Sequence, residues 1–91
     1  MAPLWCVPVH GRFSDEAAEA VAVARIDVWR TSTGTFGIES TSLVVGAPRR
    51  QDALRIVQGA LTGHALCIDS KSVSLLTLAD ASTFREQVVT P

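Results

Sequence analysis

The chain has 91 residues, of which 47% are hydrophobic and 19% charged, and its net charge is −1. This length allows a single domain over residues 1–91 with a modest core, and the aliphatic content excludes a disordered chain. The eight Lys and Arg residues are scattered along the sequence, so they do not indicate the basic face on which nucleic-acid binding depends.

The sequence also shows no membrane or export signal. No run reaches the ~18–20 apolar residues of a membrane span, and the first residues lack the basic lead and long apolar stretch of a signal peptide. The sequence therefore predicts a cytoplasmic protein that binds neither nucleic acid nor membrane.

The N-terminal stretch predicts a strand followed by a helix. Residues Leu4–His10 are β-rich, but Pro8 cannot donate to a central ladder, so this strand is expected to lie at an edge of the sheet or to be short. Ser14 is a typical N-cap residue, and Asp15 and Glu16 follow in the first turn, where acids suit the helix dipole. A run of alanines then supports the helix, which gives way to a strand near residues 22–25.

Residues 24–45 predict a β-hairpin, because two β-rich runs flank a cluster of Ser, Thr and Gly. One register pairs Val28 with Phe36 and Ile26 with Ile38, which places all four apolar side chains on one face of the sheet.

Turn chemistry leaves two registers open for this hairpin. The favoured register sets Arg25 opposite Glu39, a favourable cross-strand pair. Its loop is residues 31–33, or five residues if Arg30 and Gly34 open out. The alternative uses residues 32–34, with a glycine in the left-handed position, but it sets Asp27 against Glu39.

The clearest helix signal follows, from residue 49 to residue 62, with Pro48 suited to the first turn. Apolar residues recur on one side at 3.6-residue spacing; they are Ala53, Leu54, Ile56, Val57, Ala60 and Leu61. Gly63 is a natural stop.

Two short strands, residues 65–69 and 73–78, complete the sheet. The resulting order is strand, helix, strand, strand, helix, strand, strand, helix. It predicts an α+β fold with a small antiparallel sheet of four to five strands and helices packed mainly on one face. The first six elements have the ferredoxin-like split βαβ order, to which a C-terminal strand and helix are added.

The last helix is expected to run through Val89, capped by Asp80 or Ser82. Phe84 and Val88 fall on one face of it.

Two cysteines and two histidines are the candidates for chemistry. Cys6, His10, His64 and Cys67 are enough for a tetrahedral zinc, but their spacing matches no standard zinc motif. Both thiols lie among apolar residues, so we expect buried, unreactive cysteines, no metal and no cofactor. The carboxylates are scattered, and none forms an acid–base pair.

Arg49 and Arg50 open the second long helix. Helix N-termini attract anions, and arginines there oppose the dipole, so this helix start is a candidate for an anion or an acidic partner. Neither a P-loop nor a dinucleotide glycine pattern accompanies them.

Trp29 lies on the hairpin face opposite Val28, alongside Arg25. Trp and Arg are enriched at binding hot spots, so this face is a candidate partner surface. The competing interpretation is that a second layer, such as the final helix, covers it.

Together these patterns predict a small non-catalytic protein-interaction domain. It is either a self-associating subunit or an inhibitor, immunity or adaptor protein that binds a larger target, through Trp29, Arg25, Arg49 and Arg50. The alternative is a small dimeric enzyme or ligand-binding domain with a pocket between sheet and helices that uses His10 or His64.

Overall fold

The computed structural model describes residues 2–34 and 36–89, with the side chains of residues 87–89 left out. The elements follow the predicted order, with one short 3-10 helix added. They are β1 (Leu4–His10), α1 (Asp15–Val23), β2 (Asp27–Thr33), β3 (Glu39–Gly46), α2 (Arg50–Ala60), β4 (Cys67–Ile68), η1 (Ser70–Ser72), β5 (Ser74–Leu75) and α3 (Leu78–Val89).

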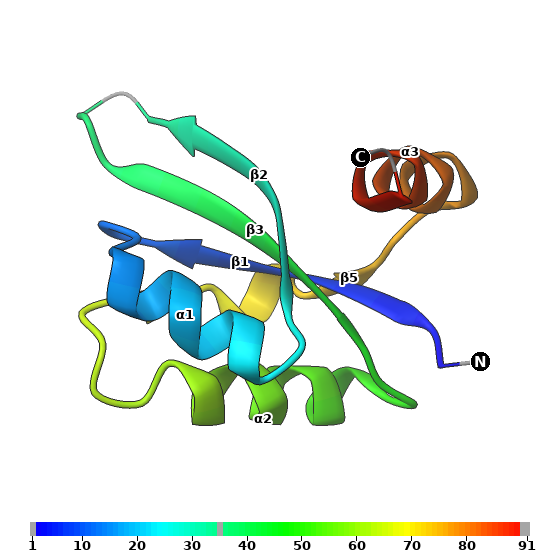
Figure 1. Cartoon of the computed structure of the whole chain (residues 1–91), viewed down its shortest axis with the longest axis horizontal. Coiled ribbons are helices and arrows are strands. Elements are labelled where there is room, and N and C mark those ends of the chain that lie inside the picture. Colours follow the sequence, from blue (N-terminus) through cyan, green and yellow to red (C-terminus); the bar gives the residue numbers. More distant parts are fainter. Residues whose placement is uncertain (1, 35, 90–91) are drawn as a thin grey trace.

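The sheet confirms the predicted α+β class. Its strand order is β2-β3-β1-β4, with β5 also pairing with β1, and the pairs are antiparallel. Strands β1 and β2 therefore run parallel with β3 between them, which is the split βαβ arrangement. Helices α1 and α2 lie side by side against one face, and α3 stands on the other side of the sheet (Figure 1).

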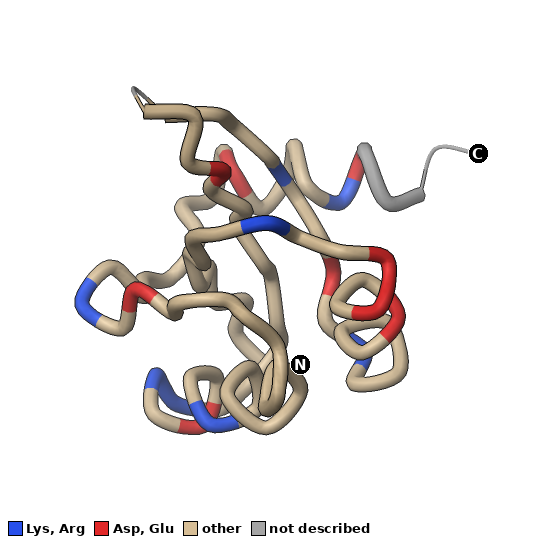
Figure 2. The backbone as a smooth tube through the Cα atoms, turned by 90° about the vertical axis from the view of Figure 1, so that its left-hand side faces the viewer, with Lys and Arg blue, Asp and Glu red and all other residues tan. Residues whose placement is uncertain are grey.

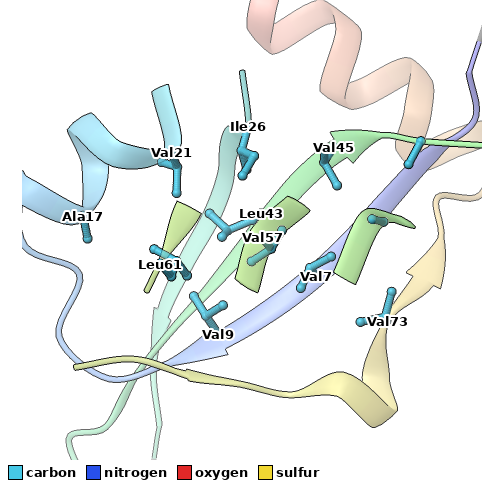
Figure 3. Packing of buried hydrophobic residues seen from close by; sticks show 12 residues of the cluster. Val7, Val9, Ala17, Val21, Ile26, Leu43, Val45, Val57, Leu61 and Val73 are labelled. Atoms are coloured by element: carbon cyan, nitrogen blue, oxygen red, sulfur yellow. The ribbon is translucent and has the colours of Figure 1, made fainter. Parts of the chain in front are cut away.

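The core lies between the sheet and helices α1 and α2. Alternate residues of β1 and β3 point toward it, because successive side chains of a strand face opposite sides. Figure 3 shows these side chains converging on those of the two helices. The members of this cluster are Val7, Val9, Ala17, Val21, Ile26, Leu43, Val45, Ala47, Ala53, Val57, Leu61 and Val73.

Strand β1 is central and not at an edge, so the edge prediction from Pro8 was wrong. The carbonyl of Pro8 accepts from the Asp69 amide at 2.9 Å, which places its backbone polar groups on the β4 side. On that side the partner strand is interrupted: β4 pairs with Val9 and His10, and β5 pairs with Trp5 and Cys6. The missing N–H of the proline thus falls at a gap, where the ladder requires no donor.

Both predicted hairpin registers were wrong. Strand β2 continues to Thr33, which pairs with Glu39, and the register shifts at a bulge between Val28 and Arg30. Arg25 pairs with no residue of β3, and Asp27 lies opposite Val44. The turn falls later in the chain than expected, after Thr33, and the Gly34 amide donates to the Ile38 carbonyl at 2.8 Å.

This later position of the turn removes two apolar residues from the core. Gly37 supplies a positive φ of 73°, which reverses the chain after Phe36. As a result the side chains of Phe36 and Ile38 are 89% and 54% exposed. Val28 is also 46% exposed, although Ile26 is buried as predicted.

The helices largely follow their predicted signals. The Ser14 hydroxyl accepts from the Ala17 amide at 3.1 Å, which confirms the predicted cap of α1. Pro48 lies outside α2, whose N-cap is Arg49. Helix α3 begins earlier than expected and is capped by Thr77, whose hydroxyl accepts from the Asp80 amide at 3.0 Å. The predicted contact of Val88 falls outside the described side chains.

Candidate functional site

The face of the sheet opposite α1 and α2 carries four of the residues singled out by sequence: Cys6, His10, Trp29 and Cys67. Alternation in β1 and β3 places Cys6, Pro8 and His10 on this second face, together with Ser40 and Val44. Helix α3 covers only one part of it, so the face divides into a covered half and an open half.

Trp29 lies in the covered half. Its ring meets Phe84 of α3 edge to face, with 6.3 Å between ring centroids, and the Arg30 guanidinium stacks 3.9 Å from the indole centroid. Arg30 also reaches Asp80 of α3 at 4.0 Å. These contacts dock α3 on the sheet, so the second layer foreseen for this face is present.

The indole N–H of Trp29 is buried and, among the described residues, has no hydrogen-bond partner. A buried donor without a partner costs on the order of 1–3 kcal/mol. Phe84 and Val44 are buried in the same half. The docking of α3 therefore combines good apolar burial with an unsatisfied polar group.

The two cysteines occupy different halves, and the prediction that both are buried was wrong for one of them. Cys6 is half-buried in the covered half, and this burial raises the pKa of its thiol. Cys67 is exposed, because β4 is a two-residue strand at the edge of the sheet and lacks a covering layer. Their chain neighbours are apolar in both cases, so local sequence did not distinguish them.

The open half carries a polar row across four strands. Ser32 of β2 lies opposite Ser40 of β3, Ser40 lies opposite His10 of β1, and His10 lies opposite Cys67 of β4. All four side chains share the second face because directly opposed residues of antiparallel strands point to the same side. Asp69 follows β4 at the end of this row.

His10 lies between a serine hydroxyl and a carboxylate. Its Nδ1 lies 2.7 Å from the Ser40 hydroxyl, and its Nε2 lies 3.6 Å from the Asp69 carboxylate. The Asp69 carboxylate accepts a hydrogen bond from the Ser72 side chain and lies near His10, and these two neighbours hold the pKa of Asp69 below its usual range. Sequence reasoning selected His10 but missed Ser40 and Asp69, because the three residues come together only through strand register.

The four candidate metal ligands do not converge. His10 and Cys67 are cross-strand neighbours, whereas Cys6 lies in the covered half and His64 lies in the turn that follows α2. In residues 2–34 and 36–89, no group of three or more His, Cys, Asp or Glu side chains is close enough to hold a metal ion.

The arginines at the start of α2 have different roles. Arg50 donates through Nε to the Val73 carbonyl at 3.2 Å and through Nη2 to the Ser70 carbonyl, so it ties η1 to the helical layer. Arg49 is exposed and pairs with Asp52 at 3.2 Å. The anion expected at this helix start therefore competes with protein acceptors for both guanidinium groups.

Arg25 ends α1 in an unusual backbone conformation. Its φ is 61°, in the left-handed region that favours glycine. The Ile26 amide donates to the Val21 carbonyl at 2.8 Å, and the Arg25 amide donates to the Ala22 carbonyl at 3.0 Å. This is a Schellman motif with an exposed arginine in the position usually taken by glycine.

An apolar groove of about 270 Å³ lies between the start of β1, β5 and α3. Its lining residues are mainly aliphatic; they are Ala2, Pro3, Leu4, Leu75, Leu76, Leu78, Ala81 and Arg85. Leu78 is 93% exposed and Leu75 54%, so two leucines of the groove wall present their side chains to solvent. Sequence analysis did not identify this groove, because its walls come from three separate segments.

Charged residues are distributed over several elements. Figure 2 shows acidic residues on α1 and mainly basic residues on α2. Within the described residues, no helix is long and apolar enough to cross a membrane.

Sequence comparison does not place the chain in a known group: no protein-family model matches it, and no curated protein is significantly similar to it.

Proposed function

We propose that this domain works by protein–protein contact and that the apolar groove between β1, β5 and α3 is the centre of the contact surface. The observation that carries the proposal is the exposure of Leu75 and Leu78 around a groove lined mainly by aliphatic side chains. Contiguous exposed apolar surface on a small domain is typical of interaction sites. A single apolar side chain from a partner is the size of anchor that such a groove accepts.

One basic residue belongs to the groove, and another lies at the start of α2. Arg85 lines the groove itself. The start of α2, whose N-cap is Arg49, is on the same side of the molecule as the N-terminus (Figure 1). A partner with an apolar anchor and acidic residues around it fits this arrangement.

The strained conformation of Arg25 supports a role outside the fold. A left-handed backbone costs an ordinary residue roughly 1–2 kcal/mol, and this exposed side chain has its guanidinium available to a partner. In this proposal Trp29 and Arg50 act indirectly: Trp29 docks the helix that forms a wall of the groove, and Arg50 holds the segment that leads into β5.

The domain is proposed to be non-catalytic at this groove, and neither His10 nor His64 lines it. An enzyme pocket normally contains convergent polar groups, whereas this groove is mainly aliphatic. A cytoplasmic location is part of the same proposal, because free thiols at Cys6 and Cys67 are compatible with a reducing compartment.

The test compares the wild type with Leu78→Ser and Phe36→Ser. Both positions are exposed apolar residues, so neither change should alter the fold, but they lie in different parts of the molecule. Each protein is used as bait in its native host's extract, captured proteins are identified by mass spectrometry, and their affinities are then measured with purified components. Light scattering of each variant reports self-association.

We expect Leu78→Ser to weaken the measured complex, or the self-association, at least tenfold, while Phe36→Ser leaves it unchanged. The reverse pattern would move the contact surface to the β2–β3 turn. A wild type that stays monomeric and binds no purified candidate would refute the proposal.

A further inference from the structure

A serine, a histidine and an aspartate lie in one line in the open half of the second face. Ser40, His10 and Asp69 come from β3, from β1 and from the segment after β4, and strand register brings them into one line. The 2.7 Å contact between the Ser40 hydroxyl and His10 Nδ1 is within the range of a strong O–H···N bond.

The two neighbours of His10 favour one tautomer of its ring. An ionised carboxylate only accepts, so the nitrogen that faces Asp69, Nε2, is the one that gains from carrying the hydrogen. In that tautomer Nδ1 is the acceptor and the Ser40 hydroxyl is the donor. This is the protonation state in which a histidine can remove the serine proton.

Asp69 is itself held in place as an anion. Its side chain accepts a hydrogen bond from Ser72, and its amide donates to the Pro8 carbonyl at 2.9 Å. The low pKa of Asp69 keeps it charged near neutral pH. The 3.6 Å separation from His10 Nε2 is longer than a hydrogen bond, as is common for such groups without substrate.

We propose that Ser40 is an activated nucleophile that takes an acyl group from an activated carboxylic ester, with His10 as general base and Asp69 as the positioning residue. The Ser40 oxygen forms a bond to the ester carbonyl carbon while its proton passes to His10 Nδ1. The bond to the leaving oxygen then breaks, and the leaving alkoxide or phenolate takes the proton from His10. The products are an acylated Ser40 and the free alcohol.

The surroundings leave room for a small acyl group, because the row lies on an open sheet face. The site is separate from the groove, so its chemistry does not depend on the proposed protein contact.

The test uses p-nitrophenyl acetate and the intact domain. Release of p-nitrophenolate gives the rate, and peptide mass spectrometry gives the acetylated residue. The variants are Ser40→Ala, His10→Gln and, as a matched control, Ser32→Ala, because Ser32 lies on the same face one strand further from His10. Thermal unfolding of each variant verifies that it is folded.

We expect acetylation of Ser40 in the wild type and in Ser32→Ala, and no acetylation at position 40 in Ser40→Ala. His10→Gln should lower the rate about 100-fold, the lower end of general-base contributions. Acetylation mainly on Cys67, which lies opposite His10, or an unchanged rate in folded His10→Gln, would overturn the proposal.

The role of Asp69 needs a readout beyond the rate. Long-range nitrogen NMR spectra report which ring nitrogen of His10 carries hydrogen. We expect the Nε2–H form in the wild type and in Asp69→Glu, and a mixture of both forms in Asp69→Asn, whose acetylation should be slower. Identical spectra in the wild type and Asp69→Asn would remove Asp69 from the proposal and leave Ser40 unassisted by a carboxylate.

Discussion

The two faces of the sheet are built from the same strands but are covered in different ways. On the first face, Val7, Val9 and Leu43 are fully buried under two helices. On the second face, α3 covers Val44 and Trp29, whereas the row that includes His10 and Ser40 remains open. Apolar residues alternate with polar ones along β1 and β3, so one face had enough apolar surface for two helices and the other for one.

The two faces therefore differ in what they contribute: the first face stabilises the fold, whereas part of the second face stays accessible to solvent. The first face supplies the continuous core on which the domain depends for folding. The second face is held by fewer contacts, and the Trp29 indole N–H beneath α3 lacks a partner among the described residues. We therefore expect substitutions on the two faces to differ in both size and kind.

The largest effect is expected on the first face. Leu61→Ala removes a buried side chain from the cluster under α2 and should lower the free energy of unfolding by roughly 2–5 kcal/mol. Urea unfolding followed by circular dichroism measures it. Gln58→Ala, on the exposed side of the same helix, is the control and should stay within about 0.5 kcal/mol of the wild type. Equal losses at both positions would contradict the placement of α2.

A smaller and local effect is expected on the second face. Phe84→Ala removes the edge-to-face contact with Trp29, so α3 should separate from the sheet before the core unfolds, with a loss of about 0.5–3 kcal/mol. In the wild type the Cys6 thiol is half-buried, and this burial raises its pKa. Alkylation of Cys6 should therefore become faster in Phe84→Ala. Cys67 is exposed in either case and serves as the internal control. Unchanged Cys6 alkylation would show that α3 does not protect this half.

The link between α1 and β2 offers a stabilising change. A left-handed residue costs about 1–2 kcal/mol when it is not glycine, and glycine loses about 0.5–1 kcal/mol more chain entropy on folding. Arg25→Gly should therefore raise the free energy of unfolding by roughly 0.5–1 kcal/mol. Arg25→Ala keeps the strain and should not stabilise. A loss of stability in Arg25→Gly would show that the arginine side chain contributes contacts that this backbone argument omits.

The smallest effect is expected in acid, in the open half. The pKa of Asp69 is lower in the folded protein than in the unfolded chain, so its contribution is present above the unfolded pKa and is lost as pH falls toward the folded value. Below about pH 4, the usual range for Asp, the wild type should lose more stability than Asp69→Asn. Urea midpoints at neutral and acid pH measure the difference. Parallel pH curves for the two proteins would contradict the charged hydrogen bonds at Asp69.

Local signals in the sequence predicted the elements whose structure depends on neighbouring residues. The Ser14 cap followed by two acids located α1, and the 3.6-residue spacing of Ala53, Val57 and Leu61 identified the buried side of α2. Element order then predicted the α+β class. These features follow from backbone hydrogen bonding and burial within one segment, so a single sequence contains them.

Features that depend on distant segments were missed. The position of Pro8 depends on a gap between β4 and β5, and the hairpin register depends on a bulge at Trp29 together with a turn at Gly37. The polar row in the open half of the second face was not predicted for the same reason. Its members are distant in the chain and become neighbours only when three strand pairs adopt their registers.

The interrupted partner of β1 has a consequence for synthesis on the ribosome. The first strand of the chain needs residues 39–46 on one side and residues 67–75 on the other before both its edges are paired. Until the last of these residues leaves the exit tunnel, at least one edge of the nascent strand is without its native partner. Such unpaired edges are the surfaces on which incomplete chains aggregate and on which chaperones act.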